Sequence, residues 1–293
     1  MFSDTHFHFP HCLESNHLFN PTELLKFFIQ NKTFFAQDIG TRCSDIYSRV
    51  EFFEKAISGL SEEEKSELKK MFWFTIGIWP DVEAIKDRYN QIKTLEKSIT
   101  DFVNSGKYNF GAVGECGIDH HWNPSGVDGR CQNDFSDSIY QGERELFVMQ
   151  IKLAKKINRP VIVHSRDGFE DTLECIKEAG YHNGIIHCYS YGLEEAKQFL
   201  DLGWYISLSG SITYTKKSKM EDMKQLINYI PKDRILLETD APYLAPVPKR
   251  GTVNTPSNVV HTYEFASEIM NMPVAELCNI VDQNCRNLFY KLN

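Results

Sequence analysis

The sequence predicts an α/β protein built as a (β/α)8 TIM barrel, and two observations lead to this fold class. Short runs rich in β-branched and aromatic residues recur eight times, with longer stretches of helical pattern between them, as parallel βα units require. His, Asp and Glu residues fall at the ends of these runs, where such barrels build their active sites. We expect one hydrolase domain over residues 1–293, although length and composition alone also allow two ordinary domains.

The eight runs are each short enough for a barrel strand. They lie at Phe2–Phe9, Thr33–Gly40, Phe72–Trp79, Phe110–Asp119, Pro160–His164, Gly184–Tyr189, Trp204–Ser209 and Arg234–Asp240. Helices are expected between them, because in segments such as Asp81–Ser105 and Glu143–Ile157 apolar residues recur at intervals of three and four. The tail from Thr255 to Asn293 is expected to form closing helices, with strong periodicity over Val274–Phe289.

Two segments are longer than a minimal connection between a strand and a helix. Cys43–Lys70 contains the acidic run SEEEKSE and predicts an extra helical insertion after strand two, with its charges on a solvated face. His120–Tyr140 is rich in glycine and polar residues and follows strand four directly. In a barrel this position is the catalytic mouth, so we expect a long loop that shapes substrate access.

The composition limits the cellular location and the kinds of partner that we expect for this protein. No apolar run is long enough to span a membrane, the start MFSDTHFHFP lacks the pattern of a signal peptide, and the eight cysteines are scattered. We therefore expect a soluble, cytoplasmic protein with reduced thiols, no membrane association and no obligate protein partner. The net charge of −8 argues against a protein that coats nucleic acid. A nuclease remains possible, because bound metal ions add local positive charge.

Six residues at the strand ends predict a metal centre. His6 and His8 are two residues apart on strand one, so their side chains point to the same side, where two buried imidazoles are costly unless something binds them. Alone, a His-x-His pair also fits a hydrogen-bonded pair, and each further residue also fits an ion pair. The coincidence of type and place favours one ligand set: His6, His8, Glu115, His164, His187 and Asp240.

This mixed nitrogen and oxygen set suits two divalent ions, with zinc, manganese, nickel and magnesium as candidates and a carboxylate able to bridge them. Such a site hydrolyses its substrate without a protein nucleophile, because two ions activate a water and hold the attacking and leaving oxygens. Asp240 is then the candidate general base, and Glu115 shares the catalytic centre with it. Asp119, His120, His121 and Trp122 beside Glu115 are candidates for orienting the ligands or forming a lid, and His120 and His121 are not expected to bind metal.

Motifs across nearly the whole chain resemble the TatD-like metal-dependent deoxyribonucleases, which are amidohydrolase-type barrels. DTHFHF is similar to the D-x-H-x-H motif of that family, GECGID resembles GEIGLD, and PVIVHSRD, HCYS, LLETDAPYL and Asn254-x-Pro256 follow in family order. The resemblance implies that His6, His8 and Asp240 bind one ion, that His164 and His187 bind the second, and that Glu115 bridges both. It also implies hydrolysis of DNA, often as a 3′ to 5′ exonuclease on single strands.

One position departs from the family pattern. The family has Gly-Ile-His-Pro after strand three, whereas this chain has GIWP, with Trp79 in place of the histidine. A tryptophan there either stacks on a base of single-stranded DNA or packs under the Cys43–Lys70 insertion. Arg166, two residues after His164, is a candidate for bidentate phosphate binding, with an ion pair to a neighbouring carboxylate as the alternative.

Two other functions fit the same barrel. The first is an amidohydrolase or lactonase acting on a small C–N or C–O substrate, since fold alone does not fix the reaction. Such enzymes commonly use a carboxylated lysine as the bridging ligand, whereas strand four offers Glu115 and no lysine, which favours the nuclease. The second is a barrel without catalysis that serves as a binding protein, which the six filled ligand positions disfavour.

Overall fold

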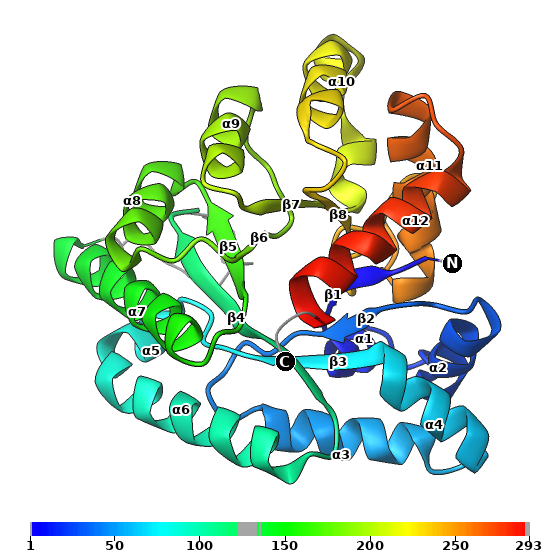
Figure 1. The fold of residues 1–293 in the computed structure, drawn as a ribbon, viewed down its shortest axis with the longest axis horizontal. Helices are drawn as coiled ribbons and strands as arrows, with labels where there is room; N and C mark the ends of the chain where they lie inside the picture. The colour runs from blue at the N-terminus through cyan, green and yellow to red at the C-terminus, as the bar shows by residue number, and fades with distance from the viewer. Residues whose placement is uncertain (1, 122–133, 135, 291–293) are drawn as a thin grey trace.

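Eight parallel strands form one sheet in which every strand pairs with the next strand in the sequence, from β1 to β8. The computed structural model describes residues 2–121, 134 and 136–290. Figure 1 shows the helices arranged around the strands, as a (β/α)8 barrel requires. The strands are β1 Asp4–Phe7, β2 Ala36–Asp38, β3 Phe72–Ile76, β4 Asn109–Asp119, β5 Val161–Arg166, β6 Gly184–Ile186, β7 Tyr205–Leu208 and β8 Ile235–Leu237.

The predicted barrel and its eight strands are therefore confirmed, although most strands are shorter than the apolar runs that predicted them. The helices are α1 Phe9–Ser15, α2 Pro21–Gln30, α3 Ile46–Ile57, α4 Glu62–Met71, α5 Val82–Lys86, α6 Arg88–Ser105, α7 Asp137–Lys156, α8 Phe169–Ala179, α9 Leu193–Asp201, α10 Met220–Tyr229, α11 Val259–Ile269 and α12 Val274–Cys285. Short 3₁₀ turns cover η2 Gly210–Tyr214, η3 Lys217–Lys219 and η4 Pro256–Asn258, and a π-helical turn, η5, covers Arg286–Tyr290.

The stretch Asp81–Ser105 is not one helix, because it breaks at Asp87 into α5 and α6. The Asp87 carboxylate accepts hydrogen bonds from the side chains of Asn90 at 2.7 Å and Gln91 at 3.3 Å. Short acidic side chains that bond to groups a few residues onward favour the start of a helix over its interior. The periodicity of the apolar residues continues across the break, so periodicity alone did not reveal it.

The barrel closes where the first strand meets the segment after the last strand. The backbone N–H of Asp240 donates to the carbonyl of His6 at 2.8 Å, and the N–H of His8 donates to the carbonyl of Ala241 at 2.8 Å. The buried Asp4 carboxylate adds a side-chain link, because it accepts bonds from the Thr239 backbone N–H at 3.0 Å and the Thr239 hydroxyl at 2.7 Å. Closure therefore fixes the relative position of residues at opposite ends of the chain.

The insertion after β2 forms two helices, as predicted. α4 starts with a capping box between Ser61 and Glu64 and carries the acidic run on its outside, whereas α3 sends Arg49 into the protein. Arg49 bonds to Asp38 at the end of β2, to Asp45 and to the carbonyl of Thr75 in β3. The predicted loop His120–Tyr140 lies partly outside the described residues, which include its ends at His120, His121 and Asp134 but not 122–133 or 135.

No helix among those the structure describes is long and apolar enough to cross a membrane.

Candidate metal centre

The structure brings all six predicted ligand residues to one place at the carboxyl end of the barrel. His6, Glu115 and His164 lie within strands β1, β4 and β5, whereas His187 follows β6 directly and Asp240 follows β8 by three residues. His8 is the residue before α1. Parallel strands deliver their ends to the same edge, so ligands far apart in sequence meet without any long connection.

Glu115 lies at the middle of this group, with a different pair of imidazoles facing each of its oxygens. Its Oε1 is 2.9 Å from His164 Nδ1 and 3.0 Å from His187 Nε2. Its Oε2 is 3.4 Å from His6 Nε2 and 3.6 Å from His8 Nε2. A carboxylate placed in this way has the arrangement of a bridging ligand between two half-sites.

Asp240 belongs to the half that contains His6 and His8. Its Oδ1 is 3.6 Å from the Nε2 atom of each of these two histidines. The backbone of Asp240 has a φ of +55°, a left-handed conformation that is uncommon for residues other than glycine, although aspartate and asparagine adopt it more often than most. The bond from its N–H to the His6 carbonyl holds this conformation, and residues held in this way are concentrated at functional sites.

The described residues contain three groups of side chains whose possible ligand atoms lie within 4.8 Å of one another inside each group. Two of the three groups share Glu115. These two are His6, His8 and Glu115, and Glu115, His164 and His187. The third contains His6, His187 and Glu238, and Glu238 is a residue that the sequence analysis missed. Its signal in the sequence is its position two residues before Asp240, which on an extended segment points both side chains to the same side.

Three of the four imidazoles have an acceptor on the side that faces away from Glu115. His164 Nε2 is 2.9 Å from Asp119 Oδ2, and His187 Nδ1 is 3.3 Å from Glu238 Oε1. His8 Nδ1 is 3.3 Å from the carbonyl of Ile39. Asp119 therefore lies where an orienting residue was expected, whereas His120 contacts Glu143 at 3.0 Å and points away from the centre.

The charges in the centre show that it attracts positive charge. Burial raises the pKa of Glu115, but the charge of His187 and hydrogen bonds from His164 and His187 outweigh burial and hold this pKa well below its ordinary value. Burial lowers the pKa of His164, yet hydrogen bonds to Asp119 and Glu115 raise it to about 9. The carboxylates and the imidazoles of this centre therefore stabilise positive charge placed between them.

The residues fit a divalent metal ion. Both ring nitrogens of His6 are fully buried and have no hydrogen-bond partner among the described residues, a state that costs free energy unless an ion or water satisfies them. Imidazole nitrogens together with carboxylate oxygens are the donors that zinc, manganese and nickel bind. The structure therefore brings together residues that could hold a metal ion: His6, His8, Glu115, His164, His187 and Asp240.

A cavity of about 1330 Å³ opens over the centre. Its wall includes both predicted substrate contacts, Trp79 and Arg166, each half-buried. The Trp79 ring lies 5.6 Å from the His164 ring, edge to face, and its backbone N–H donates to Thr41 of the loop after β2 at 2.9 Å. Trp79 thus borders the cavity and also connects the loop after β3, in which it lies, to the loop after β2.

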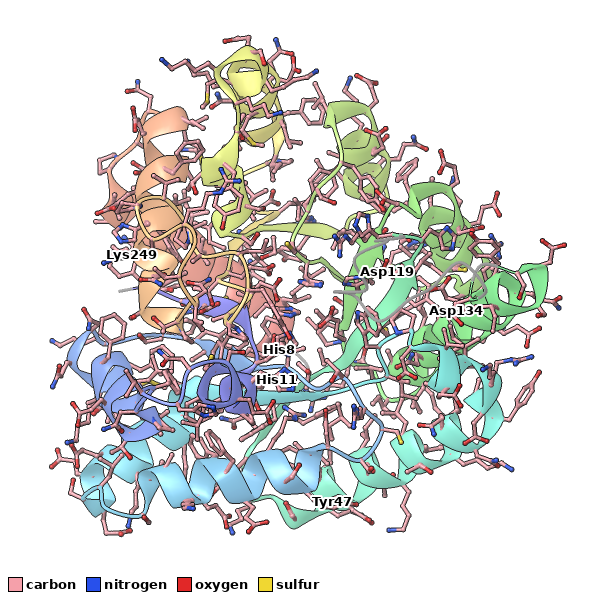
Figure 2. The ribbon with its side chains drawn as sticks, turned by 180° about the vertical axis from the view of Figure 1, so that it is seen from behind. His8, His11, Tyr47, Asp119, Asp134 and Lys249 are labelled. Carbon is pink, nitrogen blue, oxygen red and sulfur yellow. The ribbon has the colours of Figure 1, made fainter. Side chains whose placement is uncertain are left out.

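His11 is a second residue that the sequence analysis missed. It lines the cavity, its ring lies 5.3 Å from that of His8, and its buried Nδ1 has no partner in the described part of the chain. Figure 2 shows His8 and His11 close together near the middle of the barrel, with Asp119 across from them. The sequence indicated His11 only through its position three residues after His8, and a histidine at that position is also common on the surface of a helix.

Comparison with known proteins gives a consistent result. Residues 3–290 match the family model described as TatD related DNase. A Bacillus subtilis protein described as the uncharacterized metal-dependent hydrolase YabD is 36% identical over 180 residues. This match spans 61% of the present chain and 64% of the relative, so it covers less than two thirds of that protein's length.

Solved structures share the fold. The TatD homologue YJJV of Escherichia coli superposes with a TM-score of 0.74 at 24% identity, over 99% of this chain and 98% of the other. A lactonase from Deinococcus radiodurans superposes with a TM-score of 0.63 at 12% identity, over 98% and 95% of the two chains. At these identities the likeness concerns the fold alone, and the barrel is common to proteins with different substrates.

Proposed function

Because this chain belongs to the TatD related DNase family, we propose that it is a divalent-metal-dependent hydrolase that cleaves phosphodiester bonds in DNA. The observation that carries the proposal is the position of Glu115, whose two oxygens face two separate pairs of imidazoles beneath a large cavity. Two ions held a few ångströms apart suit an in-line displacement at phosphorus.

The resemblance and the geometry agree on which residues would hold the metal. His6, His8 and Asp240 would bind one ion, His164 and His187 the other, and Glu115 both. Zinc, manganese, nickel and magnesium are the candidate ions. When bound, they would supply Lewis acidity, which activates water and neutralises the phosphate charge.

The remaining chemistry belongs to the side chains. Asp240 borders both the ligand group and the cavity, so it is placed to accept a proton from the attacking water. Arg166 at the end of β5 offers a planar guanidinium that matches two phosphate oxygens. Trp79 offers an aromatic edge or face to a base.

The finer proposal is a 3′ to 5′ exonuclease that acts on single-stranded DNA. A partly exposed tryptophan beside a metal centre supports an unpaired substrate, because stacking on an aromatic side chain requires a base whose face is free. We propose further that one domain over residues 1–293 carries this activity, in the cytoplasm and without an obligate protein partner.

Degradation of labelled DNA tests the proposal. Single-stranded oligonucleotides labelled at the 3′ or the 5′ end are incubated with the protein and Mg²⁺, Mn²⁺, Zn²⁺ or EDTA. We expect metal-dependent release of nucleotides from the 3′ end and loss of about 10²–10⁴ in rate for Glu115→Ala and Asp240→Asn, because each removes a carboxylate at the reacting centre.

Asp101→Asn is the matched control, since Asp101 is an exposed carboxylate on α6 and its loss should leave the rate unchanged. A label pattern that shows internal cuts would replace the exonuclease proposal with an endonuclease. Intact DNA with every metal, from a protein that nevertheless binds ions, would reject DNA as substrate. An amidohydrolase or lactonase acting on a small C–N or C–O substrate would then be the candidate to screen.

A further inference from the structure

Two buried carboxylates contact the metal-binding imidazoles from behind. We propose that Asp119 and Glu238 are positioning residues that fix the tautomer and ring orientation of His164 and His187, so that one half of the metal centre depends on them and the other half does not. This inference rests on the metal centre of the proposed function, but not on its DNA substrate.

Asp119 is held rigidly against His164. Its Oδ2 is 2.9 Å from His164 Nε2, while the opposite ring nitrogen, Nδ1, is 2.9 Å from Glu115 Oε1. The other carboxylate oxygen of Asp119 accepts the backbone N–H of His121 at 2.8 Å. The backbone N–H of Asp119 in turn donates to the buried Glu143 carboxylate at 3.0 Å. Hydrogen bonds to both its backbone and its side chain therefore fix the orientation of Asp119.

Glu238 has the same relation to His187. Its Oε1 accepts the backbone N–H of Cys188 at 2.7 Å and lies 3.3 Å from His187 Nδ1, while His187 Nε2 is 3.0 Å from Glu115. Glu238 is fully buried, and its Oε2 has no hydrogen-bond partner among the described residues. A buried, ionisable side chain with this little local support needs a role that offsets the cost of burying it.

That role follows from the chemistry of imidazole. A neutral ring carries one N–H and one lone pair, so when the outer nitrogen donates to a carboxylate, the inner nitrogen presents its lone pair to the metal. The carboxylate also makes the ring a stronger donor and prevents its rotation. Asp119 therefore selects His164 Nδ1 as the ligand atom, and Glu238 selects His187 Nε2.

In the other half of the centre, the described residues show no carboxylate hydrogen-bonded to the outer nitrogen of an imidazole. His8 has the neutral carbonyl of Ile39 behind it, and His6 has no hydrogen-bond partner among the described residues, although a carboxylate oxygen of Glu238 lies within 4.8 Å of one of its ring nitrogens. That half gains its anionic ligand directly from Asp240. The two halves therefore obtain their negative charge in different ways, one from a ligand and one from the residues behind the ligands.

Charge balance supports the same assignment. The carboxylates in contact with the four imidazoles are those of Glu115, Asp240, Asp119 and Glu238, all buried. Buried carboxylates persist where positive charge lies beside them, and divalent ions held by these imidazoles would supply that charge.

Metal content tests the inference without any substrate. Five proteins are dialysed against buffered Zn²⁺: the wild type, Asp119→Ala, Asp119→Asn, Glu238→Ala and Glu238→Gln. The number of ions bound to each protein is measured over a range of free Zn²⁺ concentrations. We expect the affinity for one ion to fall about 10–100-fold in the Ala variants while the other ion is retained. Asn and Gln should recover part of the loss, because each keeps an acceptor oxygen.

Visible absorption of Co²⁺-loaded protein gives a second readout, since its bands should change for one site and persist for the other. Asp282→Asn is the control: Asp282 is a buried carboxylate that accepts a bond from Ser3, outside the centre. If the Ala variants bound each of the two ions with the same affinity as the wild type, the inference would be overturned. Loss of both ions together with lower melting of the metal-free protein would also overturn it, because this would indicate general structural damage.

The two proposals fail in different ways. If the wild type binds two ions and the variants lose one, but DNA stays intact, the positioning roles stand and the substrate proposal falls. If the wild type binds no ion, the positioning roles fall with the metal centre.

Discussion

Trp79 is the residue that we propose stacks on a base, because it borders the cavity and its ring contacts that of His164. Replacing it with alanine should raise KM for single-stranded DNA about 5–150-fold, the equivalent of about 1–3 kcal/mol for one stacked base. kcat should change little, because the indole of Trp79 does not ionise and so cannot transfer a proton in the reaction. Steady-state kinetics on oligonucleotides measures both constants.

Trp79→Phe is the control, because phenylalanine keeps an aromatic face and should keep most of the binding. If Trp79→Ala left KM unchanged but weakened metal binding, the ring would be a packing support for His164 and the stacking role would be wrong.

At the scale of single residues, the sequence predicted which side chains meet and also Asp119, one of the two carboxylates behind the imidazoles, but not the other, Glu238. His6 and His164 were recognisable because a ligand type at a strand end has a known direction in a barrel. Glu238 was not, because LLETDAP offers two acidic residues at one strand end and only the fold shows that Asp240 faces the cavity while Glu238 lies beneath His187.

At the scale of elements, α3 is more than a solvated helix of the insertion, because it contributes a buried charge to the packing against β2 and β3. Arg49 on α3 is buried and pairs with Asp38 at 2.7 Å and Asp45 at 3.0 Å. Burial raises the pKa of Asp38, while the charge of Arg49 opposes this rise. Removal of the guanidinium would leave a buried carboxylate without compensation.

We therefore expect Arg49→Met to lower the free energy of unfolding by about 3–5 kcal/mol, measured by urea denaturation of the metal-free protein. Lys97→Met is the matched control, since Lys97 pairs with Asp101 on the exposed surface of α6 and such pairs contribute about 0–1 kcal/mol. A similar small loss for both variants would show that α3 is dispensable for the stability of β2 and β3.

Helix ends and insertions were the elements that the sequence predicted least well. The acidic run of α4 behaves as predicted, because its charges lie outside and cap the helix. The neighbouring α3 could not be interpreted in the same way, because an arginine in an amphipathic helix is expected to be solvated until the carbonyl of Thr75 and the carboxylate of Asp38 are placed beside it.

The whole barrel was predictable because eight separate segments repeated one pattern, so an error in one strand could not change the fold class. Its stability, however, should depend on metal. Ions that bind only the folded state add about 2.7 kcal/mol each at one hundred times their dissociation constant. We expect removal of metal with EDTA to lower the melting temperature by at least about 5 °C, measured by circular dichroism.

Glu115→Ala is the control, because it removes the residue that both half-sites share. Its melting temperature should differ little with and without metal. Identical melting of the wild type in both conditions would mean that the ions bind too weakly to support the fold.

The closure between β1 and the segment after β8 also sets a time at which the protein can first act. His6 and Asp240 belong to one half of the centre, so a growing chain on the ribosome has made its first ligand long before its last. At about 5–20 residues per second, more than ten seconds separate the two. A chain that lacks Asp240 therefore lacks part of the proposed ligand set, and the proposed nuclease activity would be withheld until synthesis has passed Asp240.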